Sequence, residues 1–199
     1  LVVDSLATLH IKEGCRVHFH NSSVLMVYRD GSLIVDGKAD SLVHFSGDRL
    51  ESFYDELPGQ WGGIWFSEGS KNNYINHAEI KNGVLGLQVD FFNPNSQNPT
   101  LILNNTIVKN MSVGAIGASA TVITSENCVF AACNEYAVSL NGGIYNFKQT
   151  TIGNYAGHDG ASFLFSDYFS TSDGNIKVEP SELYMGNSIV YGTDATEVF

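Results

Sequence analysis

The sequence contains little charge, and basic charge is the scarcer kind. Lysine and arginine together number 10, against 21 aspartates and glutamates, and the formal net charge is −11 at pH 7. Binding to nucleic acid requires a basic stripe that neutralises phosphates, and docking on anionic lipid requires charge of the same sign. We therefore expect no nucleic acid among the partners, whereas neutral glycans, cations and basic protein surfaces stay open.

Helical periodicity and long apolar runs are also missing. No segment keeps apolar residues at positions i, i+3, i+4 and i+7, and none has the length and hydropathy of a transmembrane segment or a signal peptide. The chain contains instead 20 glycines, 12% aromatic residues and many asparagines, serines and threonines. Valine, isoleucine, phenylalanine and tyrosine favour strands, and glycine and asparagine favour turns. The composition predicts an all-β protein.

Cysteine is scarce as well, and its spacing fits no metal site. Cys15, Cys128 and Cys133 each lie among apolar neighbours. Such thiols usually act as small buried hydrophobic groups, so we expect three free, buried cysteines. A disulfide between Cys128 and Cys133 is the alternative.

Short apolar segments recur along the chain in three sets. Within the first set the intervals range from 22 residues, between Ile116 and Val138, to 31 residues, between Leu33 and Ile64. The first set runs through Leu9, Leu33, Ile64, Leu87, Ile116, Val138 and Phe163. The second runs through Val17, Val43, Ile75, Ile102, Ile123, Tyr145 and Tyr184, and the third through Leu25, Ile80, Ile107, Val129, Ile152 and Ile189.

Repetition at this interval indicates a solenoid. Three short strands per turn without helices predict a parallel β-helix of about seven coils, each stacked about 4.8 Å from the next, forming a single domain over residues 1–199. In a strand such as Leu33-Ile34-Val35 the outer two residues face the core and the middle one faces water. An antiparallel sandwich is the alternative fold.

Corners and insertions follow from the same pattern. Glycines between strands are expected at corners that need unusual backbone angles: Gly14, Gly31, Gly63, Gly86 and Gly143. Loop insertions break the period at residues 46–62, 90–99 and 153–181. Long loops on a rigid repeat often carry function.

The chain from Leu6 to Gly192 resembles the β-helix portion of a family of exported surface lipoproteins from gut-type Gram-negative bacteria. The matching segments are LHIKEGCRVHFH, GSLIVDGKADSLVHFSGDRL, PGQWGGIWF, INHAEIKNGVLGLQVD, GIYNFKQTTIGNYA and GNSIVYG. The resemblance implies a right-handed β-helix of the pectin-lyase-like type. It also implies a location at the outer-membrane surface or in the periplasm, a lipid anchor through a missing N-terminal signal, and further coils beyond Phe199. It implies no reaction, because the family is mostly of unestablished function.

Candidate catalytic residues are few. Arg49 lies in a loop with the carboxylates of Asp48, Glu51, Asp55 and Glu56, which could form an acid–base pair or a calcium site. The alternative is that Arg49 ties its own loop down with charge-assisted hydrogen bonds. Glu79 is expected to point outward from its strand, and Asp90 lies at a strand end, but no stacked set of acids accompanies them. No cofactor other than this calcium ion is indicated.

Candidate binding residues lie on outward strand positions. His18 and His44 are expected to form an outward ladder about 4.8 Å apart, which could bind a metal or a sugar or be simply solvated. Trp65 is expected outward beside Gln88, where its indole, together with the loop residues Tyr54 and Trp61, could stack on a sugar. Alternatively the loop 46–62 covers Trp65.

Two functions follow. The first is a non-catalytic cell-surface module that binds glycan or protein, or acts as a spacer. The alternative is a polysaccharide lyase or glycoside hydrolase, which would use Asp48, Arg49, Asp55 and Glu79.

Overall fold

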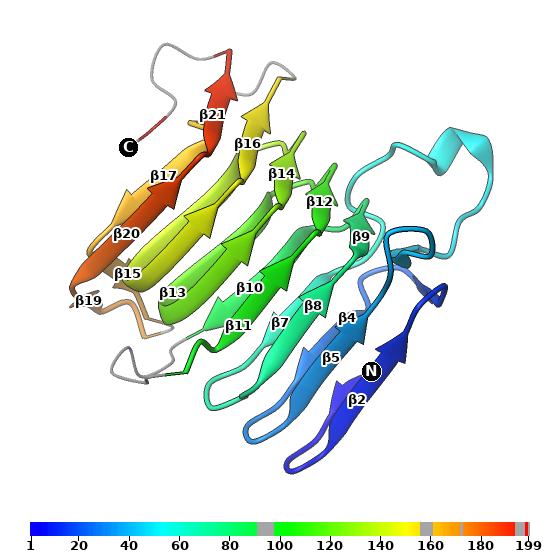
Figure 1. The fold of residues 1–199 in the computed structure, drawn as a ribbon, viewed down its shortest axis with the longest axis horizontal. Helices are drawn as coiled ribbons and strands as arrows, with labels where there is room; N and C mark the ends of the chain where they lie inside the picture. The colour runs from blue at the N-terminus through cyan, green and yellow to red at the C-terminus, as the bar shows by residue number, and fades with distance from the viewer. Residues whose placement is uncertain (91–97, 156–160, 172, 194–197, 199) are drawn as a thin grey trace.

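A computed structural model describes residues 1–90, 98–155, 161–171, 173–193 and 198 of the chain (Figure 1). The described residues form strands, one 3-10 turn at Ser52–Tyr54 (η1) and no α-helix. None of the helical segments described is long and apolar enough to cross a membrane. The strands are Val2–Val3 (β1), Thr8–Lys12 (β2), Arg16–Phe19 (β3), Val24–Val27 (β4), Ser32–Asp36 (β5), Val43–Gly47 (β6), Gly63–Phe66 (β7), Asn73–Asn76 (β8), Ala78–Lys81 (β9), Leu85–Asp90 (β10), Leu101–Asn104 (β11), Ile107–Lys109 (β12), Gly114–Glu126 (β13), Val129–Ala131 (β14), Tyr136–Lys148 (β15), Thr151–Asn154 (β16), Phe163–Ser166 (β17), Tyr168–Ser170 (β18), Ile176–Val178 (β19), Ser181–Gly186 (β20) and Ile189–Gly192 (β21).

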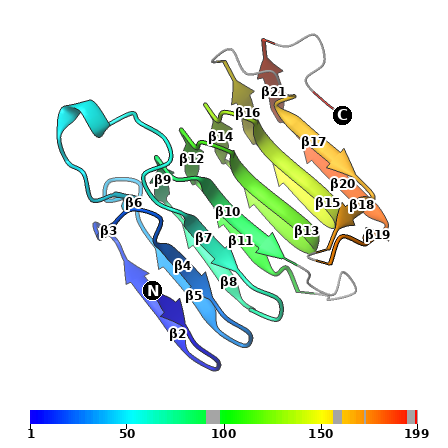
Figure 2. The ribbon, with the colours of Figure 1, turned by 180° about the vertical axis from the view of Figure 1, so that it is seen from behind.

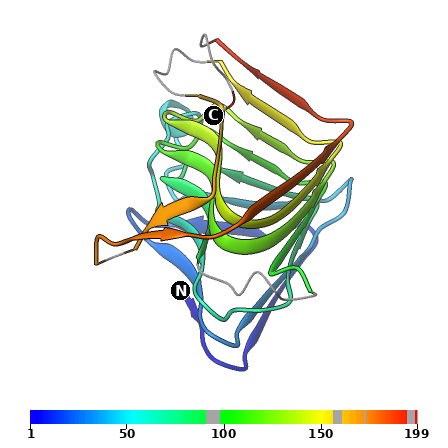
Figure 3. The ribbon, with the colours of Figure 1, turned by 90° about the vertical axis from the view of Figure 1, so that its left-hand side faces the viewer.

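Up to β12, strands three apart along the chain pair with each other in parallel, and parallel pairing continues beyond, where β13 and β15 each span two walls; successive turns of chain thus stack as layers (Figure 3). Three walls result. The first wall contains β1, β4, β7, β10, the first halves of β13 and β15, and β17. The second contains β2, β5, β8, β11, the second halves of β13 and β15, and β20. The third contains β3, β6, β9, β12, β14, β16 and β21.

The parallel pairing supports the predicted solenoid and not the antiparallel sandwich. Among the strands described, only β18 and β19 pair antiparallel. The structure is therefore all-β, with parallel sheets of the kind that a β-helix forms.

The core lies between the walls and consists of stacked apolar side chains. Ile64, Leu87, Ile116 and Val138 are in register in the first wall, and all four are 0% exposed. Each such buried side chain contributes on the order of 1.5–3 kcal/mol. The predicted alternation is confirmed in β5, where Leu33 and Val35 are buried and Ile34 is half-buried.

The three predicted strand sets are correct from Ile64 onward and wrong before it. Leu9 and Leu33 are in register with each other in the second wall, not the first. Val17 and Val43 lie in the third wall, and Leu25 pairs with Ile64 in the first. Each early strand is thus predicted in the wall that precedes its true one. The reason is that strands of all three walls show the same alternation of inward and outward residues, which does not distinguish one wall from another.

The corner between the second and third walls is built mainly by asparagine and glutamine, not by the predicted glycines. Asn105, Asn127, Gln149 and Asn187 adopt left-handed backbone angles, with φ between 49° and 54°. Side chains at this corner also bond to one another from coil to coil. Asn127 Nδ2 donates to Asn105 Oδ1 at 2.8 Å, and Asn105 Nδ2 donates to Asn76 Oδ1 at 2.9 Å. Asparagine tolerates this backbone conformation better than most residues.

The residue after each of these corners makes the same hydrogen bond. The side chains of Thr106, Cys128, Thr150 and Ser188 each donate to the carbonyl oxygen two residues earlier in the chain. Cys128 therefore occupies a position that is threonine or serine in the other coils, which explains a buried thiol there. Its pKa is raised, chiefly by burial.

Two smaller predictions are corrected. Cys128 and Cys133 are buried, but Cys15 is exposed, and all three thiols are free, so the Cys128–Cys133 disulfide is absent. Gly14, Gly63 and Gly143 have positive φ angles as expected, whereas Gly31 and Gly86 do not. At Gly143, which turns β15 from the first wall to the second, an added Cβ would lie 2.1 Å from the carbonyl oxygen of Thr121.

The insertions differ in what can be described. The first spans residues 48–62 between β6 and β7 and contains η1. Of the second, residues 91–97 lie outside the described residues, as do 156–160 and 172 of the third. The rest of the third insertion contributes β17, β18 and β19.

Candidate functional site

The loop of residues 48–62 folds beside the third wall, at the end formed by β3, β6 and β9 (Figure 2). Polar side chains position it by binding its backbone: Gln60 Nε2 donates to the Tyr54 carbonyl at 2.6 Å, and Asn82 Nδ2 donates to the Asp55 carbonyl at 2.9 Å. Lys81 Nζ lies 2.9 Å from Asp55 Oδ1. Two hollows, each lined in part by residues of this loop, make up what we call the loop cleft.

Trp61 anchors the base of this loop in the core. It is 0% exposed, its ring stacks on Phe19 with 4.3 Å between centroids, and Nε1 donates to the Lys81 carbonyl at 2.8 Å. The prediction that Trp61 joins an exposed sugar platform is therefore wrong. Trp61 lies outside any alternating strand, so its partner Phe19 could not be identified from the sequence.

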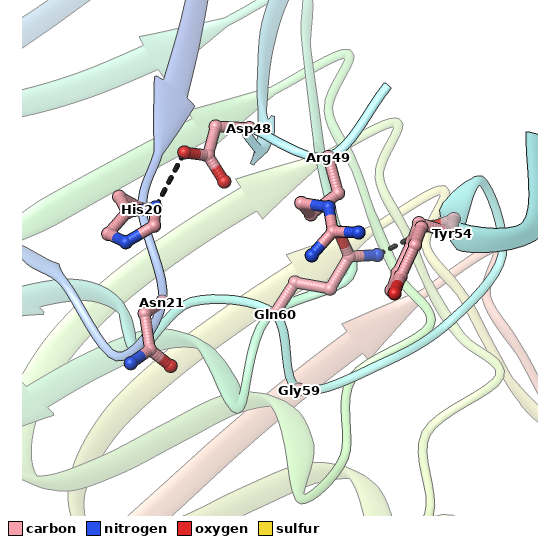
Figure 4. Close-up of a pocket in the computed structure, with 7 residues that line it drawn as sticks. All are labelled: His20, Asn21, Asp48, Arg49, Tyr54, Gly59 and Gln60. Atoms are coloured by element: carbon pink, nitrogen blue, oxygen red, sulfur yellow. Dashed lines mark hydrogen bonds and ion pairs between the residues drawn. The ribbon is translucent and has the colours of Figure 1, made fainter. Parts of the chain in front are cut away.

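The first hollow has a volume of about 260 Å³ and is lined by His20, Asn21, Asp48, Arg49, Tyr54, Gly59 and Gln60 (Figure 4). His20 Nδ1 lies 2.7 Å from Asp48 Oδ2. Arg49 lies over the Tyr54 ring, 4.1 Å from its centroid, and its Nη2 is 3.2 Å from Glu51 Oε1. These contacts match the expectation that Arg49 ties down its own loop. They also leave one face of Tyr54 covered by a guanidinium.

The ion pair with Arg49 shifts the acid–base equilibria of both partners. The hydrogen bond from Arg49 lowers the pKa of Glu51, and the hydrogen bond to Glu51 raises the pKa of Arg49. A guanidinium held charged in this way does not accept a proton at neutral pH.

The second hollow has a volume of about 210 Å³ and lies between the loop and the outward side of β3, β6 and β9. Its lining residues are Arg16, His18, His44, Phe45, Ser46, Leu50, Asp55, Glu79 and Lys81. Glu79 Oε2 lies 3.0 Å from His44 Nδ1, and Oε1 lies 3.1 Å from Lys109 Nζ. Burial acts to raise the pKa of Glu79, but the bonds and charges of Lys109 and His44 outweigh it, so the pKa is lowered. Glu79 is thus ionised at neutral pH.

The expected histidine ladder does not form. In the register of β3 and β6, His18 pairs with Ser46, and His44 pairs with Arg16. Both imidazoles point outward into the same hollow, as their strand positions predicted, but they are offset by two residues. On the other side, His44 pairs with Glu79 of β9. Among the described residues, no three side chains of histidine, cysteine, aspartate or glutamate gather in a way that could hold a metal ion.

Trp65 and Gln88 lie on a second surface, which we call the Trp65 face: the outward side of β7, β10, β13 and β15 in the first wall. The two residues are in register, as predicted. Trp65 Nε1 donates to Asp90 Oδ2 at 2.7 Å, and Gln88 Nε2 donates to the same oxygen at 2.8 Å. Burial raises the pKa of Asp90, and these two hydrogen bonds only partly oppose it.

The Trp65 face continues with small and neutral polar side chains. Ser119 is in register with Asp90, and Asn141 with Ser119. The Tyr136 ring lies over Gly114, where an added Cβ would be 2.2 Å from Cε2, and its hydroxyl reaches toward Gly117. Sequence reasoning missed Tyr136; the outward glycines on which it packs were the available signal.

Of the predicted residues, the loop cleft brings together Asp48, Arg49, Asp55 and Glu79 with Tyr54, His18 and His44. Trp65 and Gln88 lie apart from them on another wall. The loop's hydrogen bonds described above run to β9 and its neighbour Asn82 and not to Trp65, so they give no support to the loop as a cover for Trp65.

Comparisons of the chain with models of protein families, with curated proteins and with solved structures found no match.

Proposed function

We propose that this chain is a right-handed parallel β-helix module of about seven coils that binds neutral glycans without cleaving them. In this proposal it belongs to an exported surface lipoprotein, as its sequence resemblance implies. The binding surface is the Trp65 face.

The observation that supports binding most is the convergence of Trp65, Gln88 and Asp90 on an outward wall. An indole supplies an apolar surface on which a sugar ring can stack. The hydrogen bonds from Trp65 and Gln88 both reach Oδ2 of Asp90, so among the described residues neither of these donors occupies Oδ1, which can accept from a sugar hydroxyl. Aromatic, amide and carboxylate groups on one flat surface form the combination that a polyhydroxylated ligand needs.

The absence of cleavage is supported by the acids of the loop cleft. Each carboxylate expected to act there is paired with a base: Asp48 with His20, Asp55 with Lys81, and Glu79 with His44 and Lys109. Hydrolysis needs one carboxyl that keeps its proton and a second that faces it across the bond. The hydrogen bond from Lys81 lowers the pKa of Asp55, and the pKa of Glu79 is lowered as described above, so these two carboxylates stay in the charged form, which does not donate a proton.

Affinity electrophoresis in gels containing neutral polysaccharides tests the proposal. We expect wild-type chain to be retarded by at least one of them and Trp65→Ala to weaken that affinity about tenfold, because stacking on the indole contributes roughly 1.4 kcal/mol. Asp90→Asn tests the carboxylate separately. Tyr184→Ala is the matched control, since Tyr184 is 58% exposed on the second wall.

Two results would contradict the proposal. One is an unchanged mobility of the wild-type chain in every gel, or equal retardation of wild type and Trp65→Ala. The other is release of reducing ends or unsaturated sugars from the bound polysaccharide, which would restore the alternative of a glycoside hydrolase or polysaccharide lyase.

A further inference from the structure

Basic side chains gather on the third wall of this acidic chain. Arg16 and His44 are neighbours in register on the outward side of β3 and β6. His18 lies two residues after Arg16, so it projects from the same side of β3. All three line the 210 Å³ hollow beneath the loop. Three cationic or hydrogen-bonding side chains thus face one small space.

Arg16 has no acidic partner among the described residues. Arg29 and Arg49 each lie within ion-pair distance of a glutamate, whereas Arg16 has no ion pair or side-chain hydrogen bond within the part of the chain that the structure describes. An unpaired arginine destabilises a protein when it is buried, but Arg16 is exposed, so its charge is solvated without a partner. Its planar guanidinium, with five donors, is therefore open to a ligand.

In both histidines Nδ1 is the ring nitrogen that is hydrogen-bonded within the protein. His18 uses Nδ1, at 3.1 Å from both the Gly47 carbonyl and Ser46 Oγ. His44 uses Nδ1, at 3.0 Å from Glu79 Oε2. A carbonyl and a carboxylate can only accept, so Nδ1 carries the proton of the neutral ring, and Nε2 faces a ligand as a donor only when the imidazole is protonated.

The acids that share the hollow are already neutralised. Glu79 is held by Lys109 as well as by His44, and Asp55 is held by Lys81. No further carboxylate lines the hollow. An anion entering beside Arg16 therefore meets two carboxylates whose charge is balanced and one arginine whose charge is not.

From this geometry we propose that Arg16, His18 and His44 form a binding site for an oxyanion group, such as a sulfate ester or free sulfate. The guanidinium binds two of its oxygens in a fork, and each imidazole, in its protonated form, donates from Nε2–H to the others. This site is on a different wall from the Trp65 face, so it does not depend on binding of neutral glycans. Because protonation gives an imidazole its second N–H donor and a positive charge, the affinity rises as the pH falls.

The test is binding of inorganic sulfate, of a sulfated oligosaccharide and of the same oligosaccharide after desulfation, at low ionic strength and at pH 8 and 5.5. Calorimetry gives the affinity, and proton NMR of the imidazole Hε1 signals shows whether the histidines sense the ligand. We expect Arg16→Gln to weaken sulfate binding about tenfold, which corresponds to the loss of one charge-assisted contact. Arg16→Lys, which keeps the charge but not the fork, should lose less.

Arg29→Gln is the matched control, because it removes an exposed arginine that pairs with Glu68 elsewhere on the surface. It should bind sulfate as the wild type does. Retardation by neutral polysaccharide should be unchanged in Arg16→Gln, so failure of this site and failure of the Trp65 face are distinguishable.

Binding of the sulfated oligosaccharide and not of free sulfate would support the site and assign the oxyanion to a glycan substituent, whereas equal binding of both would support it as a site for the free anion. The proposal is overturned if neither ligand binds or if Arg16→Gln binds as tightly as the wild type. It is also overturned if the affinity is the same at pH 8 and 5.5, or if adding sulfate leaves the imidazole Hε1 signals unchanged.

Discussion

At the scale of single residues, Trp61 fastens the long loop to the core. Its stacking on Phe19 and its hydrogen bond to the Lys81 carbonyl join β3, β9 and the base of the loop. Trp61→Ala should lower the free energy of unfolding by about 3–5 kcal/mol, because it removes a fully buried indole and leaves a cavity. Urea denaturation measures the loss.

Trp65→Ala is the control for that experiment, because Trp65 is only half-buried, on the outside of the wall. It should cost clearly less stability than Trp61→Ala. Equal losses for the two variants would contradict the assignment of Trp61 to the core.

The two tryptophans show what a sequence can and cannot reveal about one side chain. Trp65 lies between Ile64 and Phe66, whose alternation predicted its outward position correctly. Trp61 belongs to no such alternation, and its position depends on Phe19, far away in the chain. The pairing of Asp55 with Lys81 and of Glu79 with Lys109 likewise depends on which strands stack, which no local pattern contains.

At the scale of elements, the corner between the second and third walls depends on asparagine. Asn105 has φ 49° and is the middle member of the stack formed with Asn76 and Asn127. Asn105→Gly should lower the free energy of unfolding by roughly 1–3 kcal/mol, since it removes two hydrogen bonds but keeps the backbone angle accessible. Asn105→Ala should cost about 1 kcal/mol more, because alanine is strained in the left-handed region.

Comparison of the two variants by urea denaturation separates the side-chain stack from the backbone angle. If alanine and glycine at position 105 gave the same stability, the strain would be absent. If neither variant differed from the wild type, the stack would contribute nothing.

This corner also explains why the strand sets were correct only in part. Inward and outward positions could be predicted from alternation, but every wall alternates alike. A recurring sequence segment marks the corner that leads into the third wall. It reads NTIV at 105–108, NCVF at 127–130, QTTI at 149–152 and NSIV at 187–190. In each, a left-handed residue precedes a small donor and then an outward and an inward residue. In the first coil glycine takes the left-handed position, at Gly14 with φ 74°, and the second coil has no such segment; the predicted sets are shifted in both.

At the scale of the whole molecule, stability should vary along the stack. In a solenoid each coil contacts only its neighbours, so a strand with a partner on both sides is held more firmly than one with a partner on one side. β8 lies between β5 and β11, whereas among the described strands β3 has β6 as its one partner and β21 has β16. The inward residues Val17 and Val190 of these end strands are also only partly buried.

Amide hydrogen exchange followed by mass spectrometry should therefore show a gradient. We expect peptides covering β8, β10 and β13 to exchange slower, on the order of tenfold or more, than peptides covering β3 and β21, because local opening at the ends breaks fewer contacts. Trp61→Ala should extend the fast-exchanging region inward from β3 to β9, since Trp61 connects the two strands. Uniform exchange along the stack would instead indicate that the coils open together as one cooperative unit, and it would contradict nearest-neighbour stabilisation.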